Sequence, residues 1–299
     1  MDHPSNEKRS GFVAIIGRPN VGKSTLLNRL IGEKLAGVSP KPQTTRNCIR
    51  GILSREEGQI IFVDTPGLHE PRDLLGDWMA GEARKSLAEV DLVYWIILPG
   101  PPHPYEEKIL EILRAVSLPV FLLVNQIDRF AKPEILPALD FYHKAYSFRE
   151  LIPISAKTGE QIDLLIRKTF EYLPSSPPLF PEDQISDQNE RFIAGEILRE
   201  KLFLFTGEEI PYATAVVIES FKEREDGLID IKAAIIVDKE SQKAIVIGKK
   251  GQKLKQIGRA ARLDMEKFLG KRIFLQAWVK TMPHWKRDKA ALRRLGFGG

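Results

Sequence analysis

At 299 residues, with 43% hydrophobic and 28% charged residues, the chain is long enough for two packed domains and too apolar to be mostly disordered. The formal net charge of +5 is unevenly distributed, because the residues from Lys239 onwards carry 17 Lys and Arg against 4 Asp and Glu, whereas the rest carry 28 against 36. This asymmetry excludes an evenly charged chain and indicates a C-terminal region that binds polyanions, although a merely solvated basic surface would give the same counts.

The start of the sequence contains no apolar stretch that could act as a signal peptide. The longest apolar run, Leu92 to Leu98, is far too short to span a bilayer, so any association with a membrane would be peripheral. The single cysteine, Cys48, rules out an intramolecular disulfide and fits a reducing cytosol. We therefore expect a cytoplasmic protein.

Short apolar runs typical of buried β-strands alternate with segments of helical spacing between residues 12 and 173. The runs read FVAII, IIFV, LVYWII, VFLLV and LIPI. This alternation predicts an α/β domain over residues 10–174, built on a doubly wound parallel sheet. Four prolines lie within residues 174–181, and we expect 175–184 to form a stiff, extended linker.

A glycine-rich motif follows the first predicted strand, Phe12 to Ile16. Residues Gly17 to Ser24 read GRPNVGKS and fit the G-x-x-x-x-G-K-[ST] pattern of P-loop NTPases. We expect the backbone amides to cradle phosphates, Lys23 to neutralise the β and γ oxygens, and Ser24 to ligate Mg²⁺. A chance glycine-rich turn is the alternative. The predicted phosphate-binding residues are Gly17, Arg18, Pro19, Asn20, Val21, Gly22, Lys23, Ser24 and Thr25.

The motif Asp64-Thr65-Pro66-Gly67 follows another apolar strand, which places Asp64 beside the phosphate loop at the carboxyl edge of the sheet. We expect Asp64 to hold Mg²⁺. We expect Gly67 to sense the γ-phosphate, because a residue without a Cβ allows close approach.

Two threonines lie between these motifs, in the polar stretch Gln43 to Arg46. A threonine at this place could close on Mg²⁺ when GTP is bound, and we favour Thr45 over Thr44. The alternative is a pair of solvent-exposed loop threonines.

Two further motifs predict a choice of guanine over adenine. Asp128 follows the strand Val120 to Val124 and could accept hydrogen bonds from guanine N1–H and the 2-amino group, a pair of donors that adenine lacks. The backbone amide of Ala156, after the strand Leu151 to Ile154, would meet the guanine oxygen. These motifs disfavour a P-loop kinase or ATPase with a basic tail. The predicted base-pocket residues are Asn125, Gln126, Asp128, Ser155, Ala156 and Lys157.

The second part begins with a polar helix start, Ser186 to Glu190, and its predicted order is helix, strand, strand, helix, GxxG, helix, strand. The strands Ala213 to Phe221 and Leu228 to Val237 are separated by a charged turn and predict a hairpin. The order resembles that of a type II KH domain, an α+β RNA-binding fold, over residues 185–285.

The GxxG turn, Gly248 to Gly251, would let a nucleic-acid backbone approach closely while lysines contact its phosphates. Ile245 and Ile247 either line a base groove or belong to the core. We expect 286–299 to be a basic tail and an exposed Trp285 to stack on a base. The predicted RNA-binding residues are Ile247, Gly248, Lys249, Lys250, Gly251, Lys253, Lys255, Arg259 and Trp285.

Taken together, these motifs resemble those of the small GTPases of translation, and with the second domain the chain is similar to the bacterial Era family over nearly its whole length. The resemblance implies Mg²⁺-dependent hydrolysis of GTP to GDP, with Lys23, Thr45 and Gly67 in catalytic roles. It implies slow turnover, because Leu68 stands where many regulatory GTPases carry a glutamine that orients water. The sequence departs from the family at Gln126, where a lysine is usual.

The resemblance also implies partners. It implies binding near the 3′ end of 16S rRNA, nucleotide-gated assembly of the small (30S) ribosomal subunit, and association with the inner membrane face. In related GTPases an asparagine at the position of Asn20 ligates K⁺. The equal alternative is that Asn20 only favours the turn after Pro19. We expect a monomer. The competing hypothesis is an RNA-binding scaffold that binds nucleotide with negligible turnover.

Overall fold

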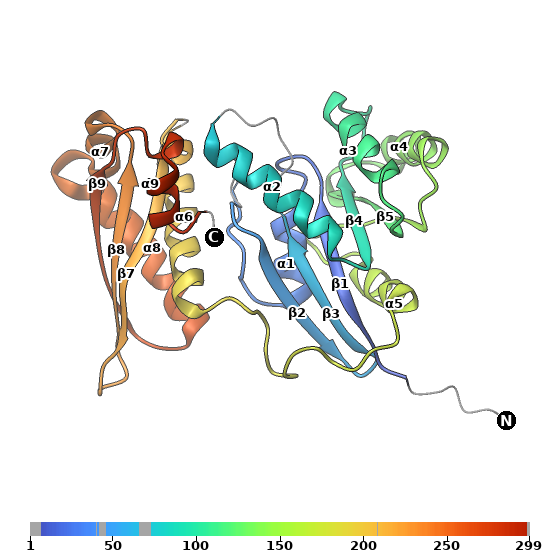
Figure 1. The fold of residues 1–299 in the computed structure, drawn as a ribbon, viewed down its shortest axis with the longest axis horizontal. Helices are drawn as coiled ribbons and strands as arrows, with labels where there is room; N and C mark the ends of the chain where they lie inside the picture. The colour runs from blue at the N-terminus through green and yellow to red at the C-terminus, as the bar shows by residue number, and fades with distance from the viewer. Residues whose placement is uncertain (1–6, 40, 42–45, 66–72, 208, 298–299) are drawn as a thin grey trace. The chain divides into compact units, whose positions relative to one another are not determined.

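The computed structural model describes residues 7–39, 41, 46–65, 73–207 and 209–297. The chain divides into two compact units (Figure 1). The N-terminal unit ends at Asp187. The C-terminal unit begins at Gln188 and, among the described residues, also takes in 36–39, 41 and 73–78.

The N-terminal unit is built on a six-stranded sheet in the order β2-β3-β1-β4-β5-β6. Every neighbouring pair is parallel except β2 and β3, which are antiparallel. The strand β2 has no counterpart among the predicted apolar runs. The strands are β1 (Arg9–Ile16), β2 (Ile49–Arg55), β3 (Gly58–Asp64), β4 (Leu92–Ile97), β5 (Val120–Val124) and β6 (Glu150–Pro153).

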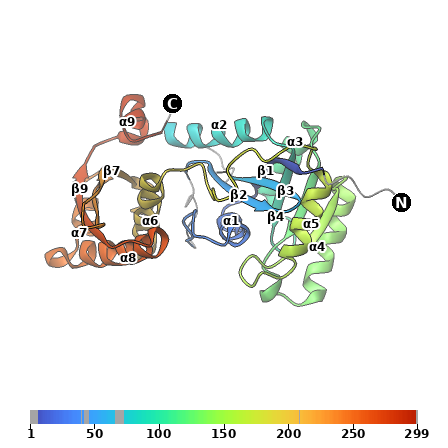
Figure 2. The same cartoon turned by 90° about the horizontal axis from the view of Figure 1, so that it is seen from below.

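Helices cover both faces of this sheet, and Figure 2 shows α1 and α2 on opposite sides of it. Adjacent residues of β4 point to opposite faces. Tyr94 hydrogen-bonds to Thr169 of α5, whereas the Trp95 ring lies 5.2 Å from the ring of Tyr142 in α4. The sheet is therefore buried between two helical layers. The helices are α1 (Lys23–Ile31), α2 (Leu74–Ala88), α3 (Pro104–Arg114), α4 (Lys132–Ala145) and α5 (Ile162–Tyr172), with a 3₁₀ turn at Ile127–Arg129.

The proline-rich stretch, residues 174–187, is extended and is bound to the N-terminal unit; we call it the strap. The amide of Ile52 in β2 donates to the Ile185 carbonyl at 2.9 Å. The buried side chain of Gln59 in β3 donates to the Phe180 carbonyl at 3.0 Å and accepts from the Leu179 and Phe180 amides, each at 2.9 Å. The predicted linker, residues 175–184, is therefore hydrogen-bonded to the N-terminal unit.

The C-terminal unit contains a three-stranded sheet, in which β7 and β8 form an antiparallel hairpin and β9 pairs with β8 in parallel. Helix α6 packs against β7 and α8, and α8 packs against β9 (Figure 1). Asn189 begins α6 by accepting the Phe192 amide at 2.8 Å. The elements are α6 (Glu190–Phe205), β7 (Thr214–Glu223), β8 (Ile229–Val237), α7 (Glu240–Ile247), α8 (Gln252–Leu269) and β9 (Ile273–Thr281), with 3₁₀ turns at Pro211–Ala213 and Lys249–Gly251.

The predicted basic tail contains regular structure. A 3₁₀ turn (Trp285–Arg287) leads into α9 (Lys289–Arg294), which Asp288 caps by accepting the Ala290 and Ala291 amides. Trp285 is fully buried, donates its indole N–H to the Ala213 carbonyl at 3.2 Å and stacks on Phe297. The prediction that Trp285 is exposed for base stacking is therefore wrong, because its ring belongs to the core that holds this segment.

Among the described residues, no helix combines the length and the apolar character needed to cross a membrane.

Candidate functional site

The predicted nucleotide motifs meet at one edge of the N-terminal sheet. Gly17 follows β1, Asp64 ends β3, Asn125 follows β5 and Ser155 follows β6. These four strands run parallel, so their carboxyl ends lie at the same edge of the sheet. Doubly wound folds bind their ligands at this edge.

The phosphate loop has the backbone that its glycines predict. Gly22 has φ +104°, and a Cβ at this position would lie 2.3 Å from Nδ2 of Asn125. Asn20 also has a positive φ of 65°. Helix α1 begins at Lys23, within the motif, so its first backbone amides, which have no partner inside the helix, lie at the loop as an anion site requires.

The Lys23 ammonium lies within the phosphate loop. Its Nζ donates to the carbonyls of Gly17 at 3.0 Å and Arg18 at 3.1 Å, and the side chain is 7% exposed. Burial lowers the pKa of Lys23 from 10.5 to about 8, with Arg18 adding to the fall and Asp64 opposing it. A phosphate anion would reverse this shift, because it supplies the negative charge that the buried ammonium needs.

The predicted magnesium ligands lie side by side. The Ser24 hydroxyl donates to Asp64 Oδ2 at 2.8 Å, and Asp64 is fully buried at the end of β3. Next to it, the Thr65 hydroxyl donates to the Ile15 carbonyl at 2.9 Å and fixes the chain leaving β3. A hydroxyl and a carboxylate are oxygen ligands of the kind that Mg²⁺ prefers, so these residues fit the ion.

Several predicted residues lie outside the described part of the chain, namely Thr44, Thr45, Pro66, Gly67 and Leu68.

Asn125 connects the phosphate loop to the predicted base pocket. Its Nδ2 donates to the Val21 carbonyl at 2.7 Å, and its Oδ1 accepts the Ala156 amide at 3.0 Å. The amide that we expect on the guanine oxygen therefore already has a partner in this structure. Asp128 is exposed and accepts the Ser155 hydroxyl at 2.7 Å, which aims its carboxylate.

Gln126, the position that departs from the family, adopts a left-handed conformation with φ 66°. Its side-chain oxygen accepts from Arg129 at 3.0 Å. The glutamine is thus engaged within the same turn.

A polar cluster that no motif predicted lies behind the phosphate loop. The carboxylate of Glu106 in α3 is 3.4 Å from Arg18 Nε and accepts the Tyr142 hydroxyl. Glu106 is 4% exposed, and it raises the pKa of Tyr142 together with burial, which has the larger effect. Sequence gave no signal for this cluster, because its members come from three separate elements.

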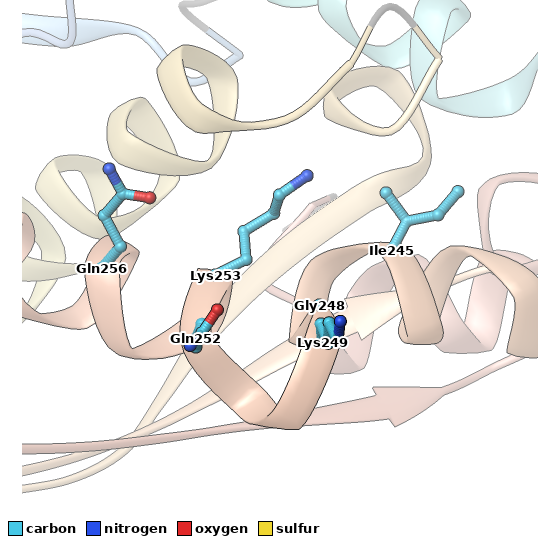
Figure 3. Close-up of a pocket in the computed structure, with 6 residues that line it drawn as sticks. All are labelled: Ile245, Gly248, Lys249, Gln252, Lys253 and Gln256. Carbon is cyan, nitrogen blue, oxygen red and sulfur yellow. The ribbon is translucent and has the colours of Figure 1, made fainter.

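The GxxG turn lies between α7 and α8 in the second unit. Gly248 has φ +70°, and a Cβ there would lie 2.6 Å from Cβ of Lys253. Gly251 has φ +75° and precedes α8 directly. Beside the turn is an open groove of about 460 Å³ (Figure 3). Its lining residues are Ile245, Gly248, Lys249, Gln252, Lys253 and Gln256.

The predicted RNA-binding residues differ in exposure, and Lys253, which lines the groove, is half-buried. Lys249, Lys250, Lys255 and Arg259 are exposed, as phosphate contacts would require, whereas Ile247 is half-buried and is absent from the groove lining.

Two groove residues, Gln252 and Gln256, were not among the predicted contacts, whereas Ile245 had been weighed as either a groove or a core residue. Ile245 is 45% exposed, and Figure 3 shows it on the same side of the turn as Lys253 and Gln256. Gln252 and Gln256 are one helical turn apart on α8, so their spacing was a signal that the sequence did offer.

Sequence profiles of two families match the chain. A profile described as "50S ribosome-binding GTPase" matches residues 12–126, and one described as "KH domain" matches residues 209–286. Both matches confirm the fold class expected from the sequence, a P-loop α/β domain followed by a KH domain.

Several proteins are similar over their full length. A GTPase Era of Geobacter metallireducens is 49% identical, over 98% of this chain and 99% of that protein. One of Syntrophus aciditrophicus is 50% identical over 97% and 95%. A solved structure of Era in complex with MgGDPNP and nucleotides 1506–1542 of 16S ribosomal RNA is 42% identical with a TM-score of 0.94, over 98% of this chain and 100% of that one. Since the matches span both units and nearly the whole of each protein compared, the chain belongs to the Era family of GTPases.

Proposed function

We propose that this GTPase hydrolyses Mg²⁺-bound GTP at the loops that follow β1, β3, β5 and β6, and that it binds single-stranded RNA at the GxxG turn. The proposed RNA is the 3′ end of 16S rRNA, the kind of RNA held in the similar Era complex. The proposed role is nucleotide-gated assembly of the small ribosomal subunit. The observation that carries the RNA part is the groove beside Gly248, bordered by exposed lysines.

Each nucleotide group has a proposed partner. Ser24 and Asp64 would hold Mg²⁺, which supplies positive charge to the phosphate oxygens during phosphoryl transfer. Lys23 would move from the loop carbonyls to the β and γ oxygens. Asp128 and the Ala156 amide would bind the guanine edge. We keep Thr45 as the residue that closes on Mg²⁺ and Gly67 as the γ-phosphate sensor.

The strap supports a coupling between the two units. It is bonded to β2 and to Gln59 of β3, and β3 ends at the proposed magnesium ligand Asp64. The first unit ends at Asp187, and α6 begins at Glu190. A change in β3 on nucleotide binding therefore has a short route to the RNA-binding unit, through the hydrogen bonds to the strap and then along the chain into α6, which is a physical basis for gating.

The test is the affinity of the full chain for a labelled 16S 3′-end oligonucleotide with GDP or GDPNP bound. We expect tighter binding with GDPNP, by a factor within the usual five- to 150-fold range, roughly, of allosteric coupling. A Gly251→Asp variant should lose RNA binding in both states. Gly270→Asp is the matched control, because both glycines flank α8 with φ of +75° and +64° and neither has an atom within 4 Å of an added Cβ.

Three outcomes count against separate parts of the proposal. Equal affinity with GDP and GDPNP would remove the gating. Equal affinity for a scrambled oligonucleotide would remove the 16S target. Loss of binding in Gly270→Asp as strong as in Gly251→Asp would remove the GxxG turn as the contact.

The scaffold hypothesis predicts negligible turnover and is tested separately. Single-turnover hydrolysis of GTP, measured with and without small subunits and in K⁺ or Na⁺, should show slow cleavage that subunits accelerate. Acceleration by K⁺ that Asn20→Ala removes would support the potassium site. No hydrolysis under any of these conditions would favour the scaffold.

We further propose that the protein is a monomer and that it associates peripherally with anionic lipid, a property that the basic C-terminal region supports. Light scattering checks the first part. Sedimentation with vesicles of anionic or zwitterionic lipid checks the second, and binding to neither vesicle would contradict it.

A further inference from the structure

The last turn of α1 carries an arginine that belongs to no nucleotide motif. Arg29 Nε donates to the Ala156 carbonyl at 3.2 Å, and Nη2 of the same guanidinium donates to the Lys157 carbonyl. A Cβ placed on Gly159 would lie 3.9–4.0 Å from Cδ, Nε and Cζ of Arg29. One side chain therefore hydrogen-bonds to two successive carbonyls of the proposed guanine-binding loop and lies close to a third position, Gly159.

These contacts fix the orientation of peptide groups. The Ala156 carbonyl and the Lys157 amide form one planar unit, so a donor on the carbonyl also sets the direction of the amide. The preceding unit is held separately, because the Ser155 carbonyl accepts the Gly159 amide at 2.8 Å and the Ala156 amide donates to Asn125 at 3.0 Å. Arg29 extends this fixation to the next two peptide units.

Helix α1 joins both ends of the nucleotide site. Lys23 and Ser24, at its start, belong to the phosphate site, and Arg29, in its last turn, holds the loop that follows β6. We propose that Arg29 is a positioning residue for guanine recognition. It fixes the two peptide units that follow the Ala156 amide, which we place on the base oxygen, and it ties that loop to the helix that binds the phosphates. This inference rests on the guanine pocket proposed above.

Arg29 is solvent-exposed, so its substitution should leave the core intact, and its bonds have the modest strength of surface hydrogen bonds. We expect Arg29→Ala to weaken GDP binding by about three- to tenfold. Arg29→Lys should be intermediate, since an ammonium lacks the planar fork that serves two carbonyls.

The experiment compares GDP, IDP and ADP binding by titration calorimetry. IDP keeps the base oxygen and lacks the 2-amino group that Asp128 would read. Arg29→Ala should therefore weaken GDP and IDP by the same factor, leaving the ratio of the two affinities and the saturated rate of hydrolysis unchanged. A general loosening of the pocket would instead reduce that ratio.

The matched control is Arg114→Ala, which removes a guanidinium bonded to the Ala145 carbonyl at 3.2 Å in the last turn of α3. It should leave GDP affinity unchanged. Unchanged GDP affinity in Arg29→Ala, a lower GDP to IDP ratio, or an equal loss in Arg114→Ala would overturn the inference. A wild-type protein that binds ADP as tightly as GDP would instead overturn the proposed guanine pocket itself.

Discussion

Lys23 binds its proton less tightly than a surface lysine, because burial in the phosphate loop disfavours its charged form more than the nearby Asp64 carboxylate favours it. Its pKa is about 8 in the folded protein against an ordinary value of 10.5. Between these values the unfolded chain binds more protons than the folded one, so this group makes the free energy of unfolding rise with pH in that window. Below pH 8 the cost of the buried charge is constant.

Nucleotide affinity should show the opposite dependence. A bound phosphate favours the charged lysine, so above pH 8 binding takes up a proton and GDP affinity falls, approaching about tenfold per pH unit. Calorimetry at pH 7, 8 and 9 in two buffers of different ionisation enthalpy measures both effects. Lys23→Met should bind weakly with no such slope. An equal slope in both proteins would assign the titration to the nucleotide.

Gly22 is a second residue whose chemistry the fold dictates. With φ +104° and an added Cβ only 2.3 Å from Asn125 Nδ2, Gly22→Ala would strain the loop and displace the amide that links it to the base pocket. We expect GDP affinity to fall at least about tenfold, since such strain costs about 1–3 kcal/mol.

Gly32, at the other end of α1, is the control for this substitution. It has φ +84° and no atom within 4 Å of an added Cβ. Gly32→Ala should therefore lower the thermal midpoint through backbone strain while GDP affinity stays within about twofold. Equal losses of affinity in both variants would show that α1 as a whole, rather than the clash at Asn125, sets the binding.

At the scale of elements, one buried side chain holds the middle of the strap, and other bonds, such as that from Ile52 to Ile185, hold its ends. Gln59 makes three hydrogen bonds to the backbone of Leu179 and Phe180 and a fourth to Ser54 at 3.0 Å. Gln59→Ala removes the partner of these partly buried groups, and we expect it to lower the free energy of unfolding by about 2–4 kcal/mol. Proteolysis within 174–187, followed by mass spectrometry, should become faster.

Gln184→Ala is the control for the strap, because that amide donates only within the strap, to the Ser186 carbonyl at 2.9 Å. It should change stability by less than about 1 kcal/mol. If both variants were cleaved at the wild-type rate, Gln59 would not be what holds the strap in place.

The strands and the strap also show which parts of the fold could be predicted from the sequence. Central strands such as β5 were predictable because both faces are buried and every residue is apolar. β2 was missed, since IRGILSR at the edge of the sheet mixes charged, polar and apolar residues. Composition predicted an extended strap, but its docking depends on the buried Gln59, more than one hundred residues away in sequence.

The candidate site likewise contains some residues that the sequence predicted and others that it did not. Motifs predicted Lys23, Ser24 and Asp64 because their chemistry requires fixed residue types at fixed spacing. The supporting contacts of Arg29 and Glu106 carried no signal, because helices α1 and α3 meet the loops only in the folded chain. Trp285 was misassigned because basic neighbours indicated exposure, whereas the packing of its ring on Phe297 is a tertiary contact.

On the scale of the whole molecule, the region proposed to bind RNA and the region that holds the nucleotide site carry net charges of opposite sign. The residues from Lys239 onwards carry 17 Lys and Arg against 4 Asp and Glu, and the rest of the chain is acidic. RNA binding through phosphate contacts releases counterions, so the affinity for the 16S 3′-end oligonucleotide should fall linearly with salt on a double-logarithmic plot. Each contact to a single strand contributes about 0.7 to the slope.

Two double variants test whether RNA binding depends on the lysines of the GxxG turn or on the net charge of the whole C-terminal unit. Lys249→Ala combined with Lys250→Ala removes two exposed cations of the GxxG turn and should reduce the slope by about 1.4. Lys271→Ala combined with Lys280→Ala removes the same charge from the same unit, but these lysines pair with Glu223 at 2.8 Å and Glu219 at 2.7 Å. That control should change the slope by less than about 0.5, because the partners already neutralise the lysines. Anisotropy titrations from 50 to 200 mM salt, roughly the range in which such slopes are measured, supply both values. Equal reductions in the two double variants would mean that the RNA responds to the charge of the whole unit, and the GxxG turn would lose its place as the phosphate contact.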